Sequence, residues 1–195
     1  MITMQKAART VRRLERRLLQ RIYGFDGWHV GHAGEPYVAD IVRYLNDRPD
    51  VDRQAVVEIG CGMGDIIRRL HVRTALGLDR DPRVLAAARM LSMFQRRPRP
   101  EFEVFEFPET PLSGEFNAII MVNWIHEIEP SALRQAVHRC IEVHLRHGGC
   151  LVLDTVQDPA YTYNHEVGSL APPGALIERL GRYARHRDVW VVRRP

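Results

Sequence analysis

The sequence contains no run of about 18 apolar residues and only three cysteines. Without such a run, no segment is expected to span a membrane. Cys61, Cys140 and Cys150 are unevenly spaced and form no C-x-x-C pair, which favours a reducing compartment over a disulfide framework. The first residues also lack the apolar stretch of a secretory signal. We therefore predict a cytoplasmic protein.

Charge is unevenly distributed along the 195 residues, although the formal net charge is only +4. Residues 1–21 hold seven basic residues and one acidic residue, and residues 179–195 hold six arginines and one aspartate. The stretch between them, residues 22–178, has 15 basic and 22 acidic residues. A mildly acidic body with basic ends argues against a protein that binds nucleic acid over its whole surface, but leaves a local patch open.

The N-terminal segment has the periodicity of an amphipathic helix. Its apolar residues recur every three or four positions, with arginines on the opposite side; they are Met4, Ala7, Val11, Leu14, Leu18 and Ile22. We expect this apolar stripe to pack on the domain. A lid or dimer element over the active site, or contact with RNA or a membrane surface, is the alternative. Residues 28–34 are expected to be a loop, and a second helix is predicted from Pro36 to Asn46.

Strands and helices are predicted to alternate over most of the chain. Five apolar runs indicate strands, at residues 55–59, 74–78, 102–105, 116–122 and 150–156. Helices are predicted at 66–70, 82–93 and 130–146, a loop at 157–173, a short helix at 175–180, and closing strands at 182–184 and 189–192. This alternation favours a parallel sheet covered on both faces, with ligands bound beyond the carboxyl ends of the strands.

A glycine-rich turn joins the first strand to the next helix. Gly60, Gly62 and Gly64 are spaced G-x-G-x-G, unlike the phosphate-binding or dinucleotide-binding glycine motifs. Such a turn allows close approach to a ligand, and the following helix offers free N–H groups. Asp79 ends the second strand, where its carboxylate can accept hydrogen bonds from both hydroxyls of a ribose. The alternatives are a turn without a ligand, and Asp79 as a helix cap.

These motifs carry a resemblance to a known family. The segment VVEIGCGMGDII followed by GLDRDPRVLAAAR resembles motifs I and II of the class I S-adenosylmethionine-dependent methyltransferases. FNAIIMVNWIHEI resembles the fourth motif of that family, and GGCLVLDTV its fifth strand, so the resemblance covers residues 53–156. The first forty residues are similar to those of uncharacterised small bacterial members.

The resemblance implies an α/β fold with three layers, Rossmann-like, whose seven-stranded, mostly parallel sheet has an antiparallel last strand. It implies one domain, residues 1–195, with a helical cap at 1–50 and the core at 53–195. S-adenosylmethionine is the implied cofactor, and no metal is expected. The implied cofactor-binding residues are Glu58, Gly60, Gly62, Gly64, Asp79, Arg80, Glu106, Phe107 and Asn123. Phe105 stands where the family usually has a glycine.

Methyl transfer needs an aligned nucleophile and, for a hydroxyl, a general base. His126, close to Asn123, is the leading candidate for the general base, and Glu127 is the second. The alternative for His126 is a structural role, in which local backbone groups satisfy its hydrogen bonds. The loop after the fifth strand supplies His165 as a second catalytic candidate. Candidate substrate-binding residues are Trp28, Tyr37, Tyr163 and Asn164. The alternative for Trp28 is a packing role in the core, and the alternative for Tyr163 and Asn164 is a solvated loop. His144 and His147 are interpreted as partners of a helix C-terminus rather than metal ligands.

The predicted function is transfer of a methyl group to an oxygen or nitrogen of a small molecule. No membrane partner is expected, nucleic acid is disfavoured, and a homodimer is left open. The alternatives are an RNA or protein methyltransferase that docks its substrate through the basic ends, and a binding module without turnover.

Overall fold

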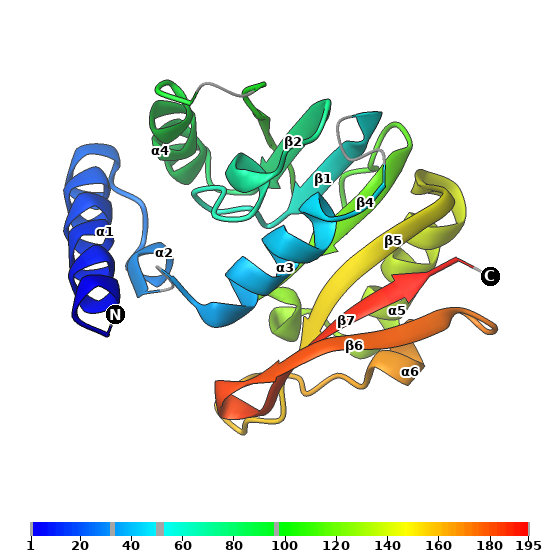
Figure 1. Cartoon of the computed structure of the whole chain (residues 1–195). Coiled ribbons are helices and arrows are strands. Elements are labelled where there is room, and N and C mark those ends of the chain that lie inside the picture. The colour runs from blue at the N-terminus through cyan, green and yellow to red at the C-terminus, as the bar shows by residue number, and fades with distance from the viewer. Residues whose placement is uncertain (1, 32–33, 50–52, 96–97, 195) are drawn as a thin grey trace.

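The computed structural model of the chain describes residues 2–31, 34–49, 53–95 and 98–194, without the side chains of residues 2–9 and 31. One sheet runs through the molecule and helices lie on its two faces (Figure 1). The strands are β1 (Ala55–Ile59), β2 (Thr74–Asp79), β3 (Glu101–Val104), β4 (Phe116–Met121), β5 (Leu145–Thr155), β6 (Leu176–Tyr183) and β7 (Arg187–Arg193). The helices are α1 (Ile2–Tyr23), α2 (Trp28–Gly31), α3 (Pro36–Asn46), α4 (Pro82–Ser92), α5 (Pro130–Arg139) and α6 (Val167–Leu170).

The strand order of the sheet is β3-β2-β1-β4-β5-β7-β6. Strands β1 to β5 pair in parallel, and β7 runs antiparallel to both of its neighbours. The chain steps from β1 outward to β3 and then crosses to β4 on the other side of β1. The switch point where such sheets bind ligands therefore lies between β1 and β4. This order confirms the predicted three-layer, Rossmann-like fold with an antiparallel last strand.

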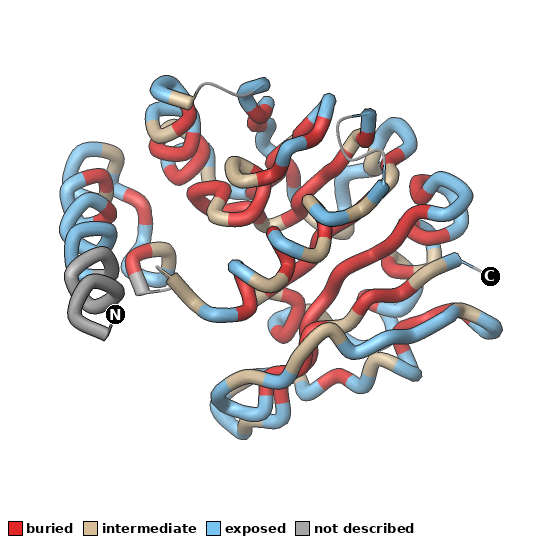
Figure 2. The backbone as a smooth tube through the Cα atoms, viewed as in Figure 1, coloured by how far each residue is buried: buried red, intermediate tan, exposed pale blue. Residues whose placement is uncertain are grey.

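Alternate side chains of the central strands enter two separate cores. In β4, Ala118 and Ile120 pack with α3, while Ile119 and Met121 pack with α5. Both sets are fully buried, and the buried part of the chain follows the central strands in Figure 2. Strands buried on both faces are apolar at nearly every position, which explains their almost continuous apolar runs in the sequence.

The N-terminal helix α1 is correctly predicted, but its orientation is not. Val11, Leu14, Leu18 and Ile22 are 59–65% exposed, whereas Arg16 and Leu19 are buried. The expectation that the apolar stripe packs on the domain is therefore wrong. A second face of the helix is used instead, because Leu19 joins a core with α4 and Arg16 forms an ion pair with Asp65.

Four other segments also differ from the predictions. The helix expected at 175–180 is instead the start of β6, and the loop expected at 28–34 contains α2. The helix expected to reach residue 146 ends as α5 at Arg139 and continues as one π-helical stretch, Cys140–His144, after which β5 begins at Leu145. At 66–70 the described helix is a single 3₁₀ turn, Ile67–Arg69.

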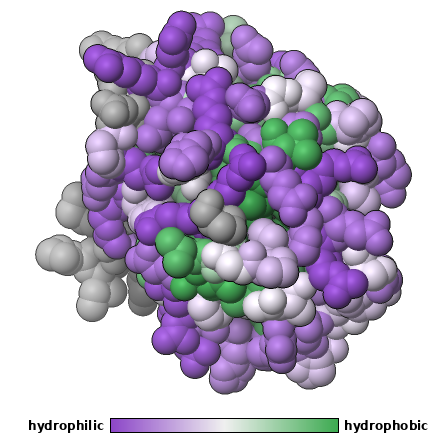
Figure 3. All heavy atoms as spheres, turned by 90° about the vertical axis from the view of Figure 1, so that its right-hand side faces the viewer, coloured by the Kyte–Doolittle hydropathy of each residue, from purple (hydrophilic) through white to green (hydrophobic). Residues whose placement is uncertain are grey.

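None of the helices in the described ranges is both long and apolar enough to cross a bilayer. The face of the molecule turned away from α1 is mostly hydrophilic, with hydrophobic residues gathered over a limited area (Figure 3).

Candidate active site

A cleft of about 1220 Å³ opens at the carboxyl ends of β1, β2 and β4. Its walls come from α1, α2 and α3, from the glycine turn, and from the segments that follow β2, β3 and β4. This is the position expected for a ligand on a parallel sheet, beside the switch point. Eleven of the fifteen residues predicted for the site line it; they are Trp28, Tyr37, Glu58, Gly60, Gly62, Asp79, Arg80, Glu106, Phe107, Asn123 and His126.

The glycine turn needs glycine for two reasons. Gly60 and Gly62 have φ values of 71° and 53°, which L side chains rarely adopt. A Cβ atom on Gly60 would lie 2.2 Å from Trp124 Nε1, and one on Gly62 would lie 3.0 Å from His29 Nδ1. The indole of Trp124 is held there because its Nε1–H donates to the Ile59 carbonyl at 2.7 Å. The turn is therefore both sharply bent and closely covered by two ring side chains.

Asp79 and Glu58 brace this turn. Asp79 accepts hydrogen bonds from the Gly62 N–H at 2.8 Å and the Asp81 N–H at 3.1 Å, one on each carboxylate oxygen. A carboxylate has about four acceptor positions, so Asp79 keeps capacity for other donors in the cleft. Glu58 accepts from the Ile67 N–H at 2.8 Å, and burial raises the pKa of its carboxyl to about 8. The cap of α4 is Asp81 rather than Asp79, because the Asp81 carboxylate accepts from the Arg83 N–H.

Asn123 follows β4 with a φ of 77°, in the left-handed region. Its backbone N–H donates to Asp154 Oδ1 at 2.7 Å. Its side-chain oxygen is buried and has no hydrogen-bond partner among the described residues, although the residue lines the cleft. Strained backbone and an unsatisfied acceptor at one residue are typical of a ligand-binding position.

A buried charged cluster lies behind His126. Asp154 in β5 is fully buried and forms an ion pair with Arg187. The Arg187 guanidinium also donates to the Tyr161 hydroxyl at 3.1 Å and lies 5.3 Å from the centre of the Tyr37 ring. These contacts join β5 and β7 to α3 and to the loop after β5.

His126 is 1% exposed, and its Nε2 lies 3.4 Å from Asp154 Oδ2. Burial lowers the pKa of the imidazole to about 4, and the Arg187 charge adds to this effect. The ring is therefore neutral near pH 7. If Nε2 carries the proton toward Asp154, Nδ1 is left as an acceptor, and it has no partner within the part of the chain that the structure describes.

The N-terminal helices form one wall of the cleft. Arg16 of α1 pairs with Asp65 and donates to the His29 carbonyl at 3.0 Å, which links α1 and α2 to the glycine turn. Trp28 lines the cleft and is 47% exposed, so its interpretation as a core anchor is wrong. On the opposite wall, the Phe107 ring meets Trp124 edge to face at 5.3 Å.

Four predicted residues are not among those that line the cleft: Gly64, Tyr163, Asn164 and His165. His165 Nε2 bonds to the Ile125 carbonyl at 3.1 Å, and the Tyr163 N–H donates to the His126 carbonyl at 3.0 Å. The Asn164 side chain accepts from the Asp158 N–H at 2.8 Å. These three residues hold the loop behind His126, and Tyr161 is the loop residue that reaches the cleft.

Sequence reasoning missed Arg16, Trp124, Asp154 and Arg187. Only Asp154 carried a signal in the sequence, because it is the one charged residue in the apolar run 150–156. A charged residue in a buried strand is rarely left without a partner, so Asp154 predicts a buried ion pair. Arg16 is one arginine among many in its helix, and nothing in the sequence distinguishes it.

His144 binds the Gly114 carbonyl at 2.9 Å through Nδ1, and the described residues contain no group of three potential metal ligands.

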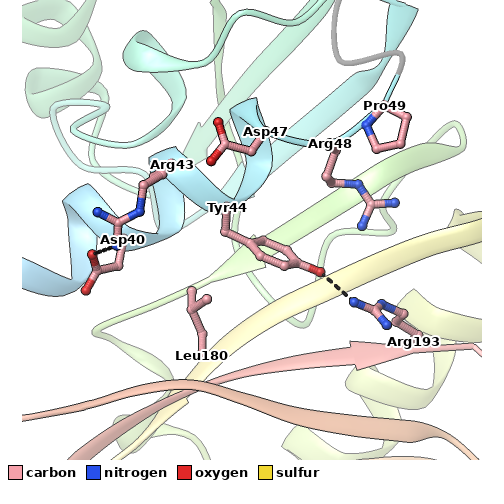
Figure 4. A pocket seen from close by; sticks show the side chains of 8 residues that line it. All are labelled: Asp40, Arg43, Tyr44, Asp47, Arg48, Pro49, Leu180 and Arg193. Atoms are coloured by element: carbon pink, nitrogen blue, oxygen red, sulfur yellow. Dashed lines mark hydrogen bonds and ion pairs between the residues drawn. The ribbon is translucent and has the colours of Figure 1, made fainter.

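A second cavity, of about 580 Å³, lies between α3 and the β6–β7 pair (Figure 4). Most of its charged groups are satisfied by the protein itself. Arg43 pairs with Asp40, Arg193 donates to the Tyr44 hydroxyl at 3.0 Å, and Arg48 donates to the Gly148 carbonyl at 2.9 Å. It shares no lining residue with the cleft.

The cleft suits the cofactor that the resemblance implies. Its volume exceeds the 300–1,000 Å³ usual for small-ligand sites. Asp79 keeps free acceptor positions for hydroxyl groups, and Asn123 holds an orphaned buried acceptor. Among the described residues, nine acidic side chains line the cleft against three arginines. Glu58 keeps its proton near pH 7 because its pKa is raised to about 8, and the other eight still leave an excess of negative charge that favours a sulfonium and an ammonium group.

Comparison with known proteins supports the same assignment. A family model described as a methyltransferase domain matches residues 56–149. A magnesium protoporphyrin IX methyltransferase from Synechocystis PCC 6803 with bound S-adenosylmethionine superposes with a TM-score of 0.67 at 16% identity, over 90% of this chain and 89% of that one. The N-methyltransferase NodS from Bradyrhizobium japonicum WM9, in complex with S-adenosylhomocysteine, gives 0.66 at 17% identity, over 93% and 98%. No curated protein matches the chain in sequence.

The matched segment begins in β1 and ends in β5, so it contains the glycine turn, Asp79 and Asn123. The solved structures extend the likeness in fold to the rest of the chain. Residues 56–149 therefore form a methyltransferase domain, and the chain is an enzyme with the fold of the methyltransferases that are solved with S-adenosylmethionine or S-adenosylhomocysteine bound.

Proposed function

We propose that the protein methylates an oxygen or nitrogen atom of a small molecule. The observation that carries this proposal is the position of His126 and Asn123, which bring unpaired acceptors to the cleft beside the glycine turn. Two similar structures are of a magnesium protoporphyrin IX methyltransferase and an N-methyltransferase, which agrees with a small-molecule acceptor.

In this proposal the residues at the ends of β1, β2 and β4 would hold the cofactor. Asp79 would accept from the ribose hydroxyls, Gly60 and Gly62 would leave room for the methionine part, and Glu58 and Asn123 would meet its polar end. Arg80, Glu106 and Phe107 would contact the adenine. When bound, S-adenosylmethionine supplies a methyl group activated by a positively charged sulfur.

His126 is the proposed proton acceptor. An imidazole with a pKa of about 4 is too weak to deprotonate a free hydroxyl or an ammonium group in advance. It is basic enough to take the proton from a hydroxyl oxygen as that oxygen gains the methyl group, because the oxygen then becomes strongly acidic. For an amine, the same Nδ1 atom accepts an N–H hydrogen bond and aims the lone pair. Asp154 and Arg187 fix the ring for either task.

The acidic lining of the cleft supports a cationic or neutral substrate. Glu127 and Glu129 are exposed at its rim, beside His126. A nucleic-acid strand would bring phosphates toward this excess of carboxylates, at an unfavourable electrostatic energy. RNA is therefore a less favourable substrate for this cleft, even though the ends of the chain are basic.

The assignment is tested first at the cofactor. We expect the wild-type protein to bind S-adenosylhomocysteine in calorimetry, and Asp79→Asn to weaken binding by about tenfold or more, since each lost hydrogen bond to a charged acceptor contributes about 1.5–3 kcal/mol. Asp158→Asn, in the loop outside the cleft lining, is the control and should bind normally. Unchanged affinity in Asp79→Asn would refute the placement of the ribose.

The substrate class is tested by labelling. Cell extract is incubated with the enzyme and methyl-labelled S-adenosylmethionine, and acid-soluble and precipitated fractions are compared. The proposal requires the enzyme-dependent label in the soluble fraction, and strong loss of it with His126→Ala. Label confined to RNA or protein would overturn the small-molecule proposal.

A further inference from the structure

The outward face of α1 is an amphipathic surface that has no partner among the described residues. Val11, Leu14, Leu18 and Ile22 form one row at helical spacing and are 59–65% exposed. The exposed Arg17 and Arg21 follow one side of the row. α1 stands at the edge of the molecule, and its described part is exposed over most of its surface (Figures 1 and 2).

This orientation of α1 is fixed by the inward face of the same helix. Arg16 and Leu19 are 5% and 2% exposed. Arg16 is paired with Asp65 of the glycine turn, and Leu19 packs with Val84 and Ala87 of α4. Turning the apolar row inward would break both contacts, so the row needs an external partner to leave water.

The charge of α1 decides which partner fits. The helix holds seven basic residues and a single acidic one, Glu15. A second copy of α1 along this face would place two strongly basic helices side by side, which is unfavourable. A nucleic acid would satisfy the arginines but not four aliphatic side chains, and the outward row has no aromatic residue for base stacking. An anionic lipid surface offers both an apolar layer and negative headgroups.

We propose that α1 docks the protein on an anionic bilayer surface. The helix lies in the interfacial plane, with Val11, Leu14, Leu18 and Ile22 among the acyl chains and the flanking arginines at the headgroups. This departs from the sequence-based expectation of no membrane partner, which assumed that the row was buried. The docking is peripheral and is independent of the methyl-transfer assignment.

The test is co-sedimentation with vesicles of phosphatidylcholine, with and without phosphatidylglycerol. We expect wild-type protein to bind the vesicles that contain phosphatidylglycerol and to be released by salt. Leu14→Gln/Leu18→Gln should weaken binding by about tenfold or more, as expected for removing two partly inserted leucines. Leu176→Gln, which changes a leucine of β6 that is 64% exposed, is the matched control and should bind like the wild type.

Charge is tested separately. Arg17→Gln/Arg21→Gln should reduce binding to the anionic vesicles, while Arg134→Gln/Arg139→Gln, on the exposed side of α5, should not. All variants should keep wild-type affinity for S-adenosylhomocysteine, which shows that they are folded. Absence of vesicle binding by the wild type would overturn the proposal. So would a wild-type dimer in light scattering that Leu14→Gln/Leu18→Gln converts to a monomer, because the row would then be covered by a second copy.

Discussion

At Gly60, a left-handed backbone coincides with an indole packed against the Cα atom. Alanine there would adopt a disfavoured φ and bring its Cβ to 2.2 Å from Trp124 Nε1. We expect Gly60→Ala to lower the free energy of unfolding by about 3 kcal/mol or more, from strain and overpacking together. Displacement of Trp124 should also abolish S-adenosylhomocysteine binding. Urea unfolding and calorimetry measure the two effects.

Gly148 provides the matched control for this substitution. Its φ is 73°, close to that of Gly60, but a Cβ there would meet no atom within 4 Å. Gly148→Ala should therefore show the backbone effect alone, about 1–2 kcal/mol, with normal ligand affinity. Equal losses of stability in the two variants would show that the contact with Trp124 is energetically unimportant.

Glu58 makes stability depend on pH. Its carboxyl has a folded-state pKa of about 8, against 4.5 when exposed. Between these values the folded protein retains a proton that the unfolded chain has lost, so stability falls as the pH rises from 4.5 to 8. From pH 6 to pH 9 the expected loss of stability from this group is about 2–3 kcal/mol. Urea unfolding at the two pH values measures it.

Glu58→Gln isolates the contribution of this carboxyl. Glutamine keeps an acceptor for the Ile67 N–H but does not ionise. The difference in unfolding free energy between pH 6 and pH 9 should shrink by about the same 2–3 kcal/mol in the variant. A variant with the full wild-type pH dependence would assign that dependence to other groups.

Among the elements, the central strands were predictable because their signal is local. β1, β2 and β4 are buried on both faces, so each is a mostly apolar run that ends at or just before a glycine or a polar residue. β6 has no such signal. It is the edge strand, most of its residues are exposed or half-buried, and the four-residue spacing of Leu176 and Leu180 imitates a helix. Pairing with β7 determines its structure.

The helix α1 shows a different limit of prediction. Its periodicity correctly predicts a helix, but two faces repeat at three and four residues, one from Val11 to Ile22 and one through Arg16, Leu19 and Tyr23. The ion pair that selects the second face joins Arg16 to Asp65, which is 49 residues away. Periodicity within one segment carries no information about such a contact.

In the whole molecule, the site residues that were predicted carry a signal within their own segment, whereas the missed ones depend on contacts between distant segments. Glu58, Gly60, Asp79 and Asn123 each stand at the end of a predicted strand, and parallel strands bring their carboxyl ends to one edge. The cluster behind His126 instead depends on the antiparallel pairing of β5 with β7, which places Arg187 beside Asp154. That pairing follows from the closed fold rather than from either segment.

The folded chain also separates its charges, with carboxylates in the cleft and basic residues on α1. S-adenosylmethionine carries a positive sulfur that S-adenosylhomocysteine lacks, so the acidic cleft should favour the former at low ionic strength. We expect the affinity for S-adenosylmethionine divided by the affinity for S-adenosylhomocysteine, both measured by calorimetry, to fall as salt is added, because screening weakens this preference.

The same ratio should respond to carboxylates of the cleft but not to carboxylates elsewhere. Glu109→Gln/Glu127→Gln removes two exposed charges at the rim, and we expect it to lower the ratio about two- to fourfold at low salt. Glu101→Gln/Glu103→Gln removes two exposed charges from β3, outside the cleft lining, and should change it much less. If both pairs had the same effect, net charge rather than the local field of the cleft would govern the preference. A ratio independent of salt in the wild type would remove the electrostatic argument for a cationic ligand altogether.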